Sequence, residues 1–280
     1  MTRLAYLGPR GTYTEAAAAL HDPQADLLPA TTVAEAVAAV ERNEADACVC
    51  ALENSLEGGV RETLDQMLRE DLTIAIAGEI VLPIRHALIG GANTDPRTAT
   101  VVYSHPQALA QCRQRLTAVA PAAQPVAALS TSSAIESAIA ETDALAIGNA
   151  HAAQLYGARV IDPDLADEAD NETRFVLLAP MDRPPTGDDK TSIAFTTQHD
   201  RPGSLMEALN LFSERGINLT RVESRPTRRQ LGTYIFLIDM EGHQTEPPLA
   251  AALTALDGLA EWLRVLGSYP CWRGTRATEG

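Results

Sequence analysis

The residues most able to do chemistry stand together in one short segment, Asn171-Glu172-Thr173-Arg174, which joins an amide, a carboxylate, a hydroxyl and a guanidinium. Directly after them comes the apolar run FVLL (175–178), which predicts a short buried strand. A solvated loop that happens to precede a strand would have the same composition. Whether these four groups belong to a site therefore depends on what the rest of the chain places beside them.

Five other polar insertions each follow a predicted strand. The strands are predicted at residues 4–7, 47–52, 100–103, 126–129 and 144–147, and the insertions are GPRGT (8–12), ENS (53–55), SHPQ (104–107), STSS (130–133) and GN (148–149). In an open parallel sheet, the carboxyl ends of the strands and the helix N-termini that follow them form the edge where ligands bind. Each insertion alone has a structural explanation: Thr12 as a helix cap, Asn149 as turn chemistry, His105 as a packed surface histidine. Five of them at one edge favour a polar pocket for an oxygen-rich anion.

The elements that must position these residues alternate along the first 180 positions. Between the strands lie helical patterns opened by Ser/Thr-x-x-Glu pairs, at Thr12/Glu15, Thr32/Glu35 and Ser133/Glu136. This βαβα rhythm predicts an α/β fold of mostly parallel sheets flanked by helices. Residues 181–190 (MDRPPTGDDK) then interrupt the pattern with prolines, a glycine and charges, and predict an interdomain linker.

A second, shorter pattern follows the linker. Its elements have the order βαββαβ, which predicts a ferredoxin-like domain. Strands are predicted at 191–197, 217–224, 233–240 and 262–266, and helices at 204–215, opened by Ser204 and Glu207, and at 247–259.

Composition narrows the classes of function. A net charge of −15 argues against nucleic acid or an anionic membrane as the main partner. No apolar run approaches the ~20 residues of a membrane span, and the N-terminus lacks a signal-peptide pattern, so we expect a cytoplasmic protein. The four cysteines have no zinc spacing, so core packing and no metal site are expected. Lys190 is the only lysine, which argues against pyridoxal chemistry or a P-loop and leaves cationic work to arginine.

Taken in order, the polar blocks resemble those of prephenate dehydratases. The blocks are YLGPRGTYTEAA (6–17), ALENSLEGGV (51–60), SHPQALAQC (104–112), STSSA (130–134), AIGNAHAAQLYG (146–157) and NETRF (171–175). Three C-terminal blocks resemble the regulatory ACT domain attached to those enzymes: RPGSLMEAL (201–209), INLTRVESRP (217–226) and GTYIFLIDMEGH (232–243). The resemblance covers nearly the whole chain, and the absence of preceding chorismate mutase sequence suggests the monofunctional form.

The resemblance implies a catalytic domain over residues 1–180 with a two-lobed, periplasmic-binding-protein-like α/β fold. Lobe one would span about 1–77 and 172–180 and lobe two about 78–171, followed by the linker at 181–190, the ACT domain at 191–270 and a tail at 271–280. In such a fold the strand that returns to lobe one runs antiparallel to its neighbours. NETR would then precede an apolar strand because it is delivered into the cleft.

The chemistry implied by the resemblance is the conversion of prephenate to phenylpyruvate with loss of carbon dioxide and water, by a carbon–oxygen lyase that needs no cofactor. The family's essential threonine aligns with Thr173, which is expected to protonate or hydrogen-bond the leaving hydroxyl with Glu53 as its partner. Arg174 is expected to hold a substrate carboxylate, although an ion pair with Glu172 or another carboxylate is the alternative. Phe175 should pack beneath the site. The other expected substrate-binding residues are Thr12, Asn54, Ser55, His105, Gln107, Thr131, Ser132 and Asn149.

For the second domain, the resemblance implies that phenylalanine binds at an interface between two ACT domains, within a homodimer or homotetramer. The expected effector-binding residues are Gly203, Ser204, Leu205, Asn218, Leu219, Glu223, Ser224, Arg225 and Pro226. This domain could also be a dimerisation module only. Two other interpretations stay open for the whole chain: the same scaffold acting on arogenate, and a non-enzymatic amino-acid sensor.

Overall fold

The computed structural model describes the chain except for residues 129, 169, 181–182, 198–201, 228–231 and 275–280. The chain divides into two compact units: Met1–Leu64 with Val81–Phe175, and Asp65–Ile80 with Val176–Gly280. Parts of three sequence predictions lie outside the described residues: the start of the linker, the last residue of the strand at 126–129, and most of the tail.

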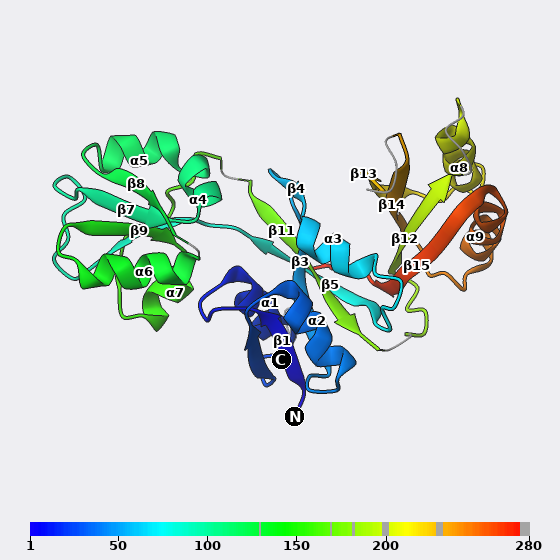
Figure 1. Ribbon diagram of the computed structural model, residues 1–280, viewed down its shortest axis with the longest axis horizontal. Helices are drawn as coiled ribbons and strands as arrows, with labels where there is room; N and C mark the ends of the chain where they lie inside the picture. The colour runs from blue at the N-terminus through cyan, green and yellow to red at the C-terminus, as the bar shows by residue number, and fades with distance from the viewer. Residues whose placement is uncertain (129, 169, 181–182, 198–201, 228–231, 275–280) are drawn as a thin grey trace. The chain divides into compact units, whose positions relative to one another are not determined.

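The first sheet has the strand order β2-β1-β3-β11-β5, with the short strand β4 paired to β3 (Figure 1). Strand β1 pairs in parallel with β2 and β3. The predicted caps Thr12 and Thr32 are confirmed, since each side chain accepts a hydrogen bond from the backbone of the glutamate three residues later. The elements are β1 (Arg3–Leu7), α1 (Tyr13–His21), β2 (Asp26–Ala30), α2 (Val33–Glu41), β3 (Ala47–Asn54), β4 (Gly58–Gly59), α3 (Arg61–Met67), β5 (Ala75–Pro83) and β11 (Glu172–Ala179).

Strand β11 lies between β3 and β5 and runs against both. At its amino end, Glu172 O accepts from Ser55 N at 2.9 Å, just past the carboxyl end of β3. Asn171 O accepts from Ile84 N at 2.7 Å, just past the carboxyl end of β5. Carboxyl ends that meet an amino end identify antiparallel neighbours. The returning strand therefore has the predicted direction, and NETR lies at the edge where β3 ends.

The second sheet has the order β10-β6-β9-β7-β8. One apolar cluster packs α4 and α5 on one face, and a second packs α6 and α7 on the other, as Figure 1 shows. Ser130 rather than Ser133 caps α6, because the helix begins three residues earlier than predicted and Ser133 closes the capping box. The elements are β6 (Ala87–Gly90), β7 (Val101–Ser104), α4 (Pro106–Gln111), α5 (Arg113–Val119), β8 (Gln124–Ala127), α6 (Thr131–Ala140), β9 (Ala144–Gly148), α7 (Ala150–Leu155) and β10 (Arg159–Asp162).

The C-terminal domain is a ferredoxin-like βαββαβ unit, as predicted. Its antiparallel sheet has the order β13-β14-β12-β15, and α8 and α9 pack on one face around Phe195, Phe212 and Ile238. Gly203, not Ser204, is the N-cap of α8, and its φ of 91° places it in the left-handed region that favours glycine. The elements are β12 (Asp189–Thr197), α8 (Ser204–Ser213), β13 (Leu219–Pro226), β14 (Tyr234–Glu241), α9 (Pro247–Leu259) and β15 (Ala260–Pro270).

The helix-free face of this sheet lies against residues 65–80 of the same unit. Lys190 Nζ on β12 donates to both carboxylate oxygens of Glu79 on β5, at 2.8 and 2.9 Å. The Glu79 side chain is only 2% exposed. Gly267 on β15 approaches β5 so closely that a Cβ there would collide with the backbone oxygen of Ile76. Residues 65–80 and the C-terminal domain therefore pack as one body.

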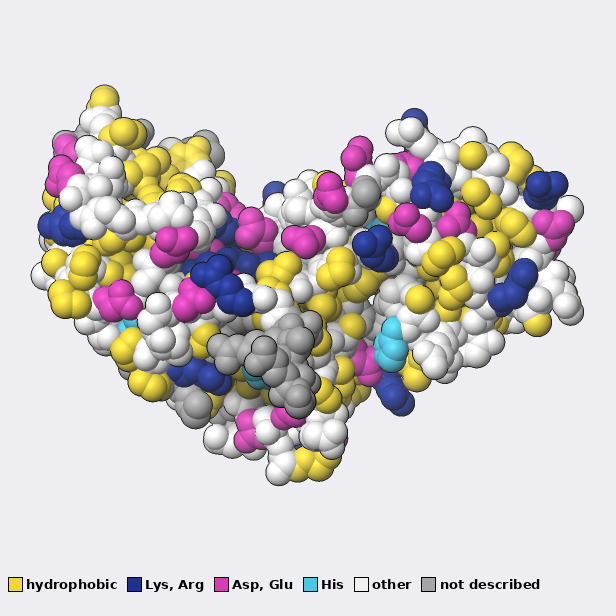
Figure 2. Space-filling view, turned by 180° about the vertical axis from the view of Figure 1, so that it is seen from behind, with side chains coloured by type: hydrophobic (Ala, Val, Ile, Leu, Met, Phe, Trp, Pro, Cys, Tyr) yellow, Lys and Arg dark blue, Asp and Glu magenta, His cyan; other side chains and the backbone are white. Residues whose placement is uncertain are grey.

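Charged side chains of both signs lie on the face shown in Figure 2. On the face shown in Figure 2, acidic and basic groups lie in small mixed clusters between apolar and neutral side chains. Within the described part of the chain, no helix has the length and apolar character required to cross a membrane. Cys48, Cys50 and Cys112 are buried and Cys271 is partly buried, and burial raises the pKa of the Cys112 thiol to about 12.

Candidate active site

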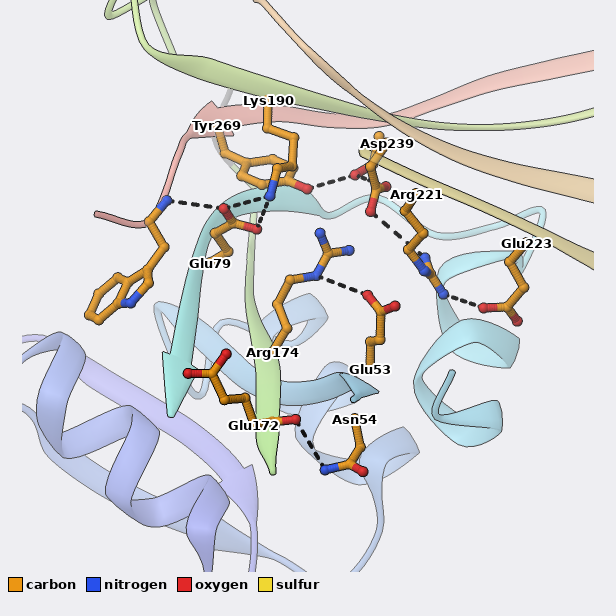
Figure 3. Close-up of polar contacts among 12 residues, drawn as sticks. Glu53, Asn54, Glu79, Glu172, Arg174, Lys190, Arg221, Glu223, Asp239 and Tyr269 are labelled. Atoms are coloured by element: carbon orange, nitrogen blue, oxygen red, sulfur yellow. Dashed lines mark hydrogen bonds and ion pairs between the residues drawn. The ribbon is translucent and has the colours of Figure 1, made fainter. Parts of the chain in front are cut away.

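Two side-chain pairs lie on opposite faces of the sheet where β3 ends and β11 begins. Because successive strand residues point to opposite faces, Thr173 and Arg174 cannot serve the same face of β11. Thr173 contacts Asn54 on one face, and Arg174 contacts Glu53 on the other. Figure 3 shows Glu53 and Asn54 extending from opposite sides of β3. The sequence blocks that looked like one group therefore form two pairs.

Asn54 holds the Thr173 hydroxyl. Its Nδ2 lies 2.9 Å from Thr173 Oγ1, and its Oδ1 accepts from the backbone N–H groups of Leu56 at 3.0 Å and Glu57 at 3.1 Å. Those two donors fix the amide orientation, so the NH₂ group must face the hydroxyl. Thr173 Oγ1 then accepts a hydrogen bond and keeps its own proton for donation to another group. Only 8% of Thr173 is exposed, so this hydroxyl is largely shielded from water.

Glu53 and Arg174 form the second pair, and it bears on two predictions. Arg174 Nε lies 3.7 Å from Glu53 Oε2, and the two side chains are 11% and 36% exposed. Glu53 is therefore not the partner of the Thr173 hydroxyl, because Asn54 takes that position. Arg174 has the ion pair that the alternative predicted, with Glu53 rather than Glu172. Both arrangements follow from the two-residue period of a strand.

Asn171, and three polar residues that the sequence analysis did not single out, join the Thr173 face. Asn171 Oδ1 accepts from Asn54 Nδ2 at 2.7 Å, and Asn171 Nδ2 donates to Gln111 Oε1 at 3.0 Å. That oxygen also lies 2.8 Å from His86 Nε2, and Gln111 Nε2 donates to Glu57 Oε1 at 3.2 Å. The signal for Gln111 was available, since it lies four residues after Gln107 and one helical turn along the same face of α4. His86 stands alone between two strands and gave no signal.

Ser132 and Asn149 hold a backbone segment of the other lobe. Ser132 Oγ donates to Arg10 O at 2.5 Å, and Asn149 Nδ2 donates to Gly11 O at 2.8 Å. Gly11 has a φ of 86°, and a Cβ there would lie 3.0 Å from the Ala152 side chain. The two predicted substrate donors are thus engaged in joining the glycine loop after β1 to α6 and α7, because the lobes meet at this point.

The remaining predicted residues are divided between caps and the edge of the site. Thr12 caps α1, and His105 caps α4 through Nδ1, which accepts from Gln107 N at 3.3 Å. Ser55 Oγ accepts from Glu172 N at 3.0 Å and lies beside the Thr173 pair. Phe175 is 1% exposed and points to the Thr173 face, which agrees with packing beneath the site. Thr131 and Gln107 begin α6 and α4 at the carboxyl edge of the second sheet.

The predicted effector residues lie at the α8 N-terminus and on the edge strand β13. Around Gly203 the structure leaves open space where a Cβ would stand. Glu223 pairs with Arg221, and Arg225 pairs with Asp65 at the end of α3, so these two β13 side chains face residues of their own unit. Asn218 Nδ2 donates to Glu241 Oε1 at 3.1 Å. Ser204, Leu205, Leu219, Ser224 and Pro226 complete the set on α8 and β13.

Fold and site together define a two-lobed α/β protein with a buried hydroxyl–amide site and a C-terminal ferredoxin-like domain. A family model described as prephenate dehydratase matches residues 4–183, and one described as ACT domain matches residues 191–258. The chain belongs to the prephenate dehydratase family and carries an ACT domain.

Individual relatives agree with this assignment. Over 96% of its length the chain is 41% identical to a bifunctional chorismate mutase/prephenate dehydratase from Aquifex aeolicus, 73% of which is covered. It is 40% identical to a prephenate dehydratase from Amycolatopsis methanolica, with 99% of this chain and 91% of that relative covered. A solved prephenate dehydratase from Arthrobacter aurescens in complex with L-Phe is 36% identical, with a TM-score of 0.87 over 96% of this chain and 90% of that one.

Proposed function

We propose that this protein is a carbon–oxygen lyase that converts prephenate to phenylpyruvate. The ring carboxylate leaves as carbon dioxide, and its bonding electron pair enters the ring as the ring carbon–oxygen bond breaks. The departing hydroxide takes up one proton and leaves as water. Aromatisation drives the reaction, so the balance requires a proton donor but no oxidant or reductant.

The single observation that carries the proposal is the Thr173–Asn54 pair. A threonine hydroxyl is a weak acid, and it donates better when its oxygen already accepts a hydrogen bond that stabilises the charge left behind. Asn54 Nδ2 provides that bond at 2.9 Å, in a fixed amide orientation. Thr173 therefore acts as the proton donor to the leaving hydroxide, and Asn54 replaces Glu53 as the group that supports it.

Neutral donors at the same edge remain the proposed contacts for the substrate's carboxylates and carbonyl. Ser55 lies beside Glu172, and His105, Gln107 and Thr131 occupy helix starts at the carboxyl edge of the second sheet. Backbone N–H groups at such helix starts attract anions. Arg174 is left out of this set because it lies on the opposite face of β11.

The ACT domain is proposed to bind phenylalanine and to inhibit the enzyme, in a homodimer or homotetramer joined through these domains. The support is the solved relative that contains L-Phe and the open space around Gly203, where no side chain covers the backbone.

In the test, the purified chain is incubated with prephenate and, separately, with arogenate. Phenylpyruvate absorbance is recorded in the first case and phenylalanine formation in the second. Phenylalanine binding is measured in parallel by calorimetry without substrate. Turnover of prephenate supports the proposal, and a clear preference for arogenate would replace the substrate. A chain that binds phenylalanine but turns over neither compound would instead be an amino-acid sensor.

A further inference from the structure

His86 ends a chain of hydrogen bonds that leads to Thr173. It lies between β5 and β6, only 7% exposed, with its ring edge-on to Tyr13 at 6.4 Å between centroids. Its Nε2 is 2.8 Å from Gln111 Oε1. None of the chemistry above uses this imidazole.

Each amide in the chain is oriented by its neighbour. Gln111 Oε1 faces both His86 Nε2 and Asn171 Nδ2, and both lone pairs of that carbonyl are thereby engaged. Asn171 consequently turns its own oxygen toward Asn54 Nδ2, which is shared with Thr173 Oγ1. The order runs from His86 through Gln111 and Asn171 to Asn54 and Thr173.

Two contacts outside the chain also favour this order: Gln111 Nε2 donates to Glu57 Oε1, and backbone N–H groups hold the Asn54 amide. Every member is satisfied only if His86 carries a proton on Nε2. With a bare Nε2, Gln111 Oε1 would face a second acceptor. Turning Gln111 would give up the Glu57 contact and place its NH₂ against Asn171 Nδ2, and a compensating turn of Asn171 would place two donors 2.7 Å apart at Asn54. Either arrangement would disturb the contact of Asn54 with Thr173.

Burial makes this tautomer choice relevant at neutral pH. It lowers the pKa of His86 below its ordinary value, although the hydrogen bond to Gln111 acts the other way. The imidazole is therefore neutral, with one protonated nitrogen, and its partner decides which nitrogen that is.

We propose that His86 is a positioning residue for the dehydratase reaction: as an Nε2–H donor it supports the orientation of the Gln111 and Asn171 amides that matches the backbone-held Asn54 amide on the Thr173 hydroxyl. The inference rests on the proposed function for its catalytic consequence. The tautomer itself is a property of the resting protein and is independent of substrate.

The kinetic experiment compares His86→Phe, which keeps a ring beside Tyr13 but lacks a donor, with His86→Gln, whose side-chain NH₂ reaches the Nε2 position. His86→Phe should lower kcat about 10- to 100-fold with KM within about 3-fold, since a transition-state contact is disturbed rather than substrate binding. His86→Gln should recover most of the loss. His243→Phe removes another buried histidine, in the ACT domain, and should leave kcat unchanged.

A second measurement reads the tautomer by ¹⁵N NMR of the imidazole in the resting wild-type protein. An Nε2–H tautomer is expected. An Nδ1–H tautomer, a normal kcat for folded His86→Phe, or equal losses in the Phe and Gln variants would each overturn the proposal. If wild-type protein fails to turn over prephenate, the proposed function fails, while the NMR result still decides the hydrogen-bond order.

Discussion

At the scale of single residues, the site depends on which neighbour a side chain faces rather than on which neighbour precedes it in the sequence. Thr173 and Arg174 are consecutive, yet one is supported by an amide and the other by a carboxylate. Asn54 and Glu53 are likewise consecutive on β3, and their side chains point to opposite faces of the sheet. Each pair therefore makes its own prediction, one for catalysis and one for stability.

Replacing Thr173 by valine removes the hydroxyl and keeps nearly the same volume. If this group protonates the leaving hydroxide, kcat should fall ~100-fold or more while KM changes little, because the contact strengthens only in the transition state. Steady-state kinetics with prephenate check this, with a circular-dichroism melt as the folding control. Near-normal turnover in the folded variant would remove Thr173 from the mechanism.

Arg174→Lys tests the role of the second pair. Because Arg174 faces Glu53 and not the Thr173 side of β11, we expect KM for prephenate to stay within about 2-fold of wild type. Losing the planar guanidinium should cost about 1–2 kcal/mol in the free energy of unfolding, a value for a partly buried pair. Glu53→Gln should give a similar loss of stability. A large rise in KM for Arg174→Lys, without the same rise for Glu53→Gln, would show that Arg174 binds the substrate.

The lowered pKa of His86 predicts how stability depends on pH. In the unfolded chain this imidazole titrates near 6.5, and in the folded chain only at lower pH. Below about pH 6.5 the unfolded state binds more protons, so stability falls as pH drops and is unaffected by this group above it. Thermal melts should therefore show a smaller loss between about pH 7.5 and pH 5.5 in His86→Gln than in wild type. Parallel curves for the two proteins would show that His86 titrates normally.

At the scale of elements, the sequence predicts the strands and helices that have a clear apolar pattern or capping pair. It does not predict features that depend on how those elements pack. Long apolar runs and capping pairs predicted β1, β3, β7, β9 and the βαββαβ unit. Strands β2, β4, β5, β6 and β10 were not predicted. Strand β2 contains a proline and carries little apolar alternation. The direction of β11 followed from the family resemblance, whereas the face each residue serves required the partner strands. The contacts of Ser132 and Asn149 with the Arg10–Gly11 backbone could not be predicted, because the sequence does not reveal that the lobes meet at Gly11.

Gly267 offers an element-scale test of how β15 packs on β5. Its φ is 153°, and any Cβ at this position would collide with the backbone of Ile76, so there is no room for a side chain. Gly267→Ala should therefore lower the free energy of unfolding by about 2 kcal/mol or more. Gly258→Ala is the matched control, because this exposed glycine of α9 has open space around it and alanine should stabilise the helix by about 0.5–1 kcal/mol. Chemical denaturation of both variants measures the difference.

At the scale of the whole molecule, the ACT domain shares a compact unit with residues 65–80 of the catalytic region. The Glu79 carboxylate accepts from both Lys190 Nζ and Trp272 N. Removing the C-terminal domain would remove both donors and uncover the surface that residues 65–80 bury against it. A chain that ends at Pro180 is therefore expected to be unstable, and regulation has to be tested in the full chain.

Helix α3 carries residues that belong to different compact units of the chain. Its Asp65 pairs with Arg225 of the β13 effector segment, and its Thr63 Oγ1 donates to Ala51 O on β3 at 2.6 Å. Strand β3 ends in Asn54, which supports Thr173. Asp65 is itself neither a proposed effector residue nor a proposed substrate residue.

Asp65→Asn in the full chain should weaken inhibition by phenylalanine while leaving uninhibited kcat close to wild type. Coupling between two sites is a free energy, and loss of the Arg225 ion pair should raise the half-inhibiting phenylalanine concentration about 5-fold or more. Asp71→Asn is the control, since Asp71 pairs with Arg69 on the same segment but its side chain is 75% exposed.

Gly203→Val should abolish inhibition altogether, because the valine side chain would fill the proposed effector site and strain a left-handed residue. Activity measured against phenylalanine concentration for wild type and the three variants decides the matter. Unchanged inhibition in Asp65→Asn, with phenylalanine still bound in calorimetry, would show that the signal leaves the ACT domain by a route other than α3.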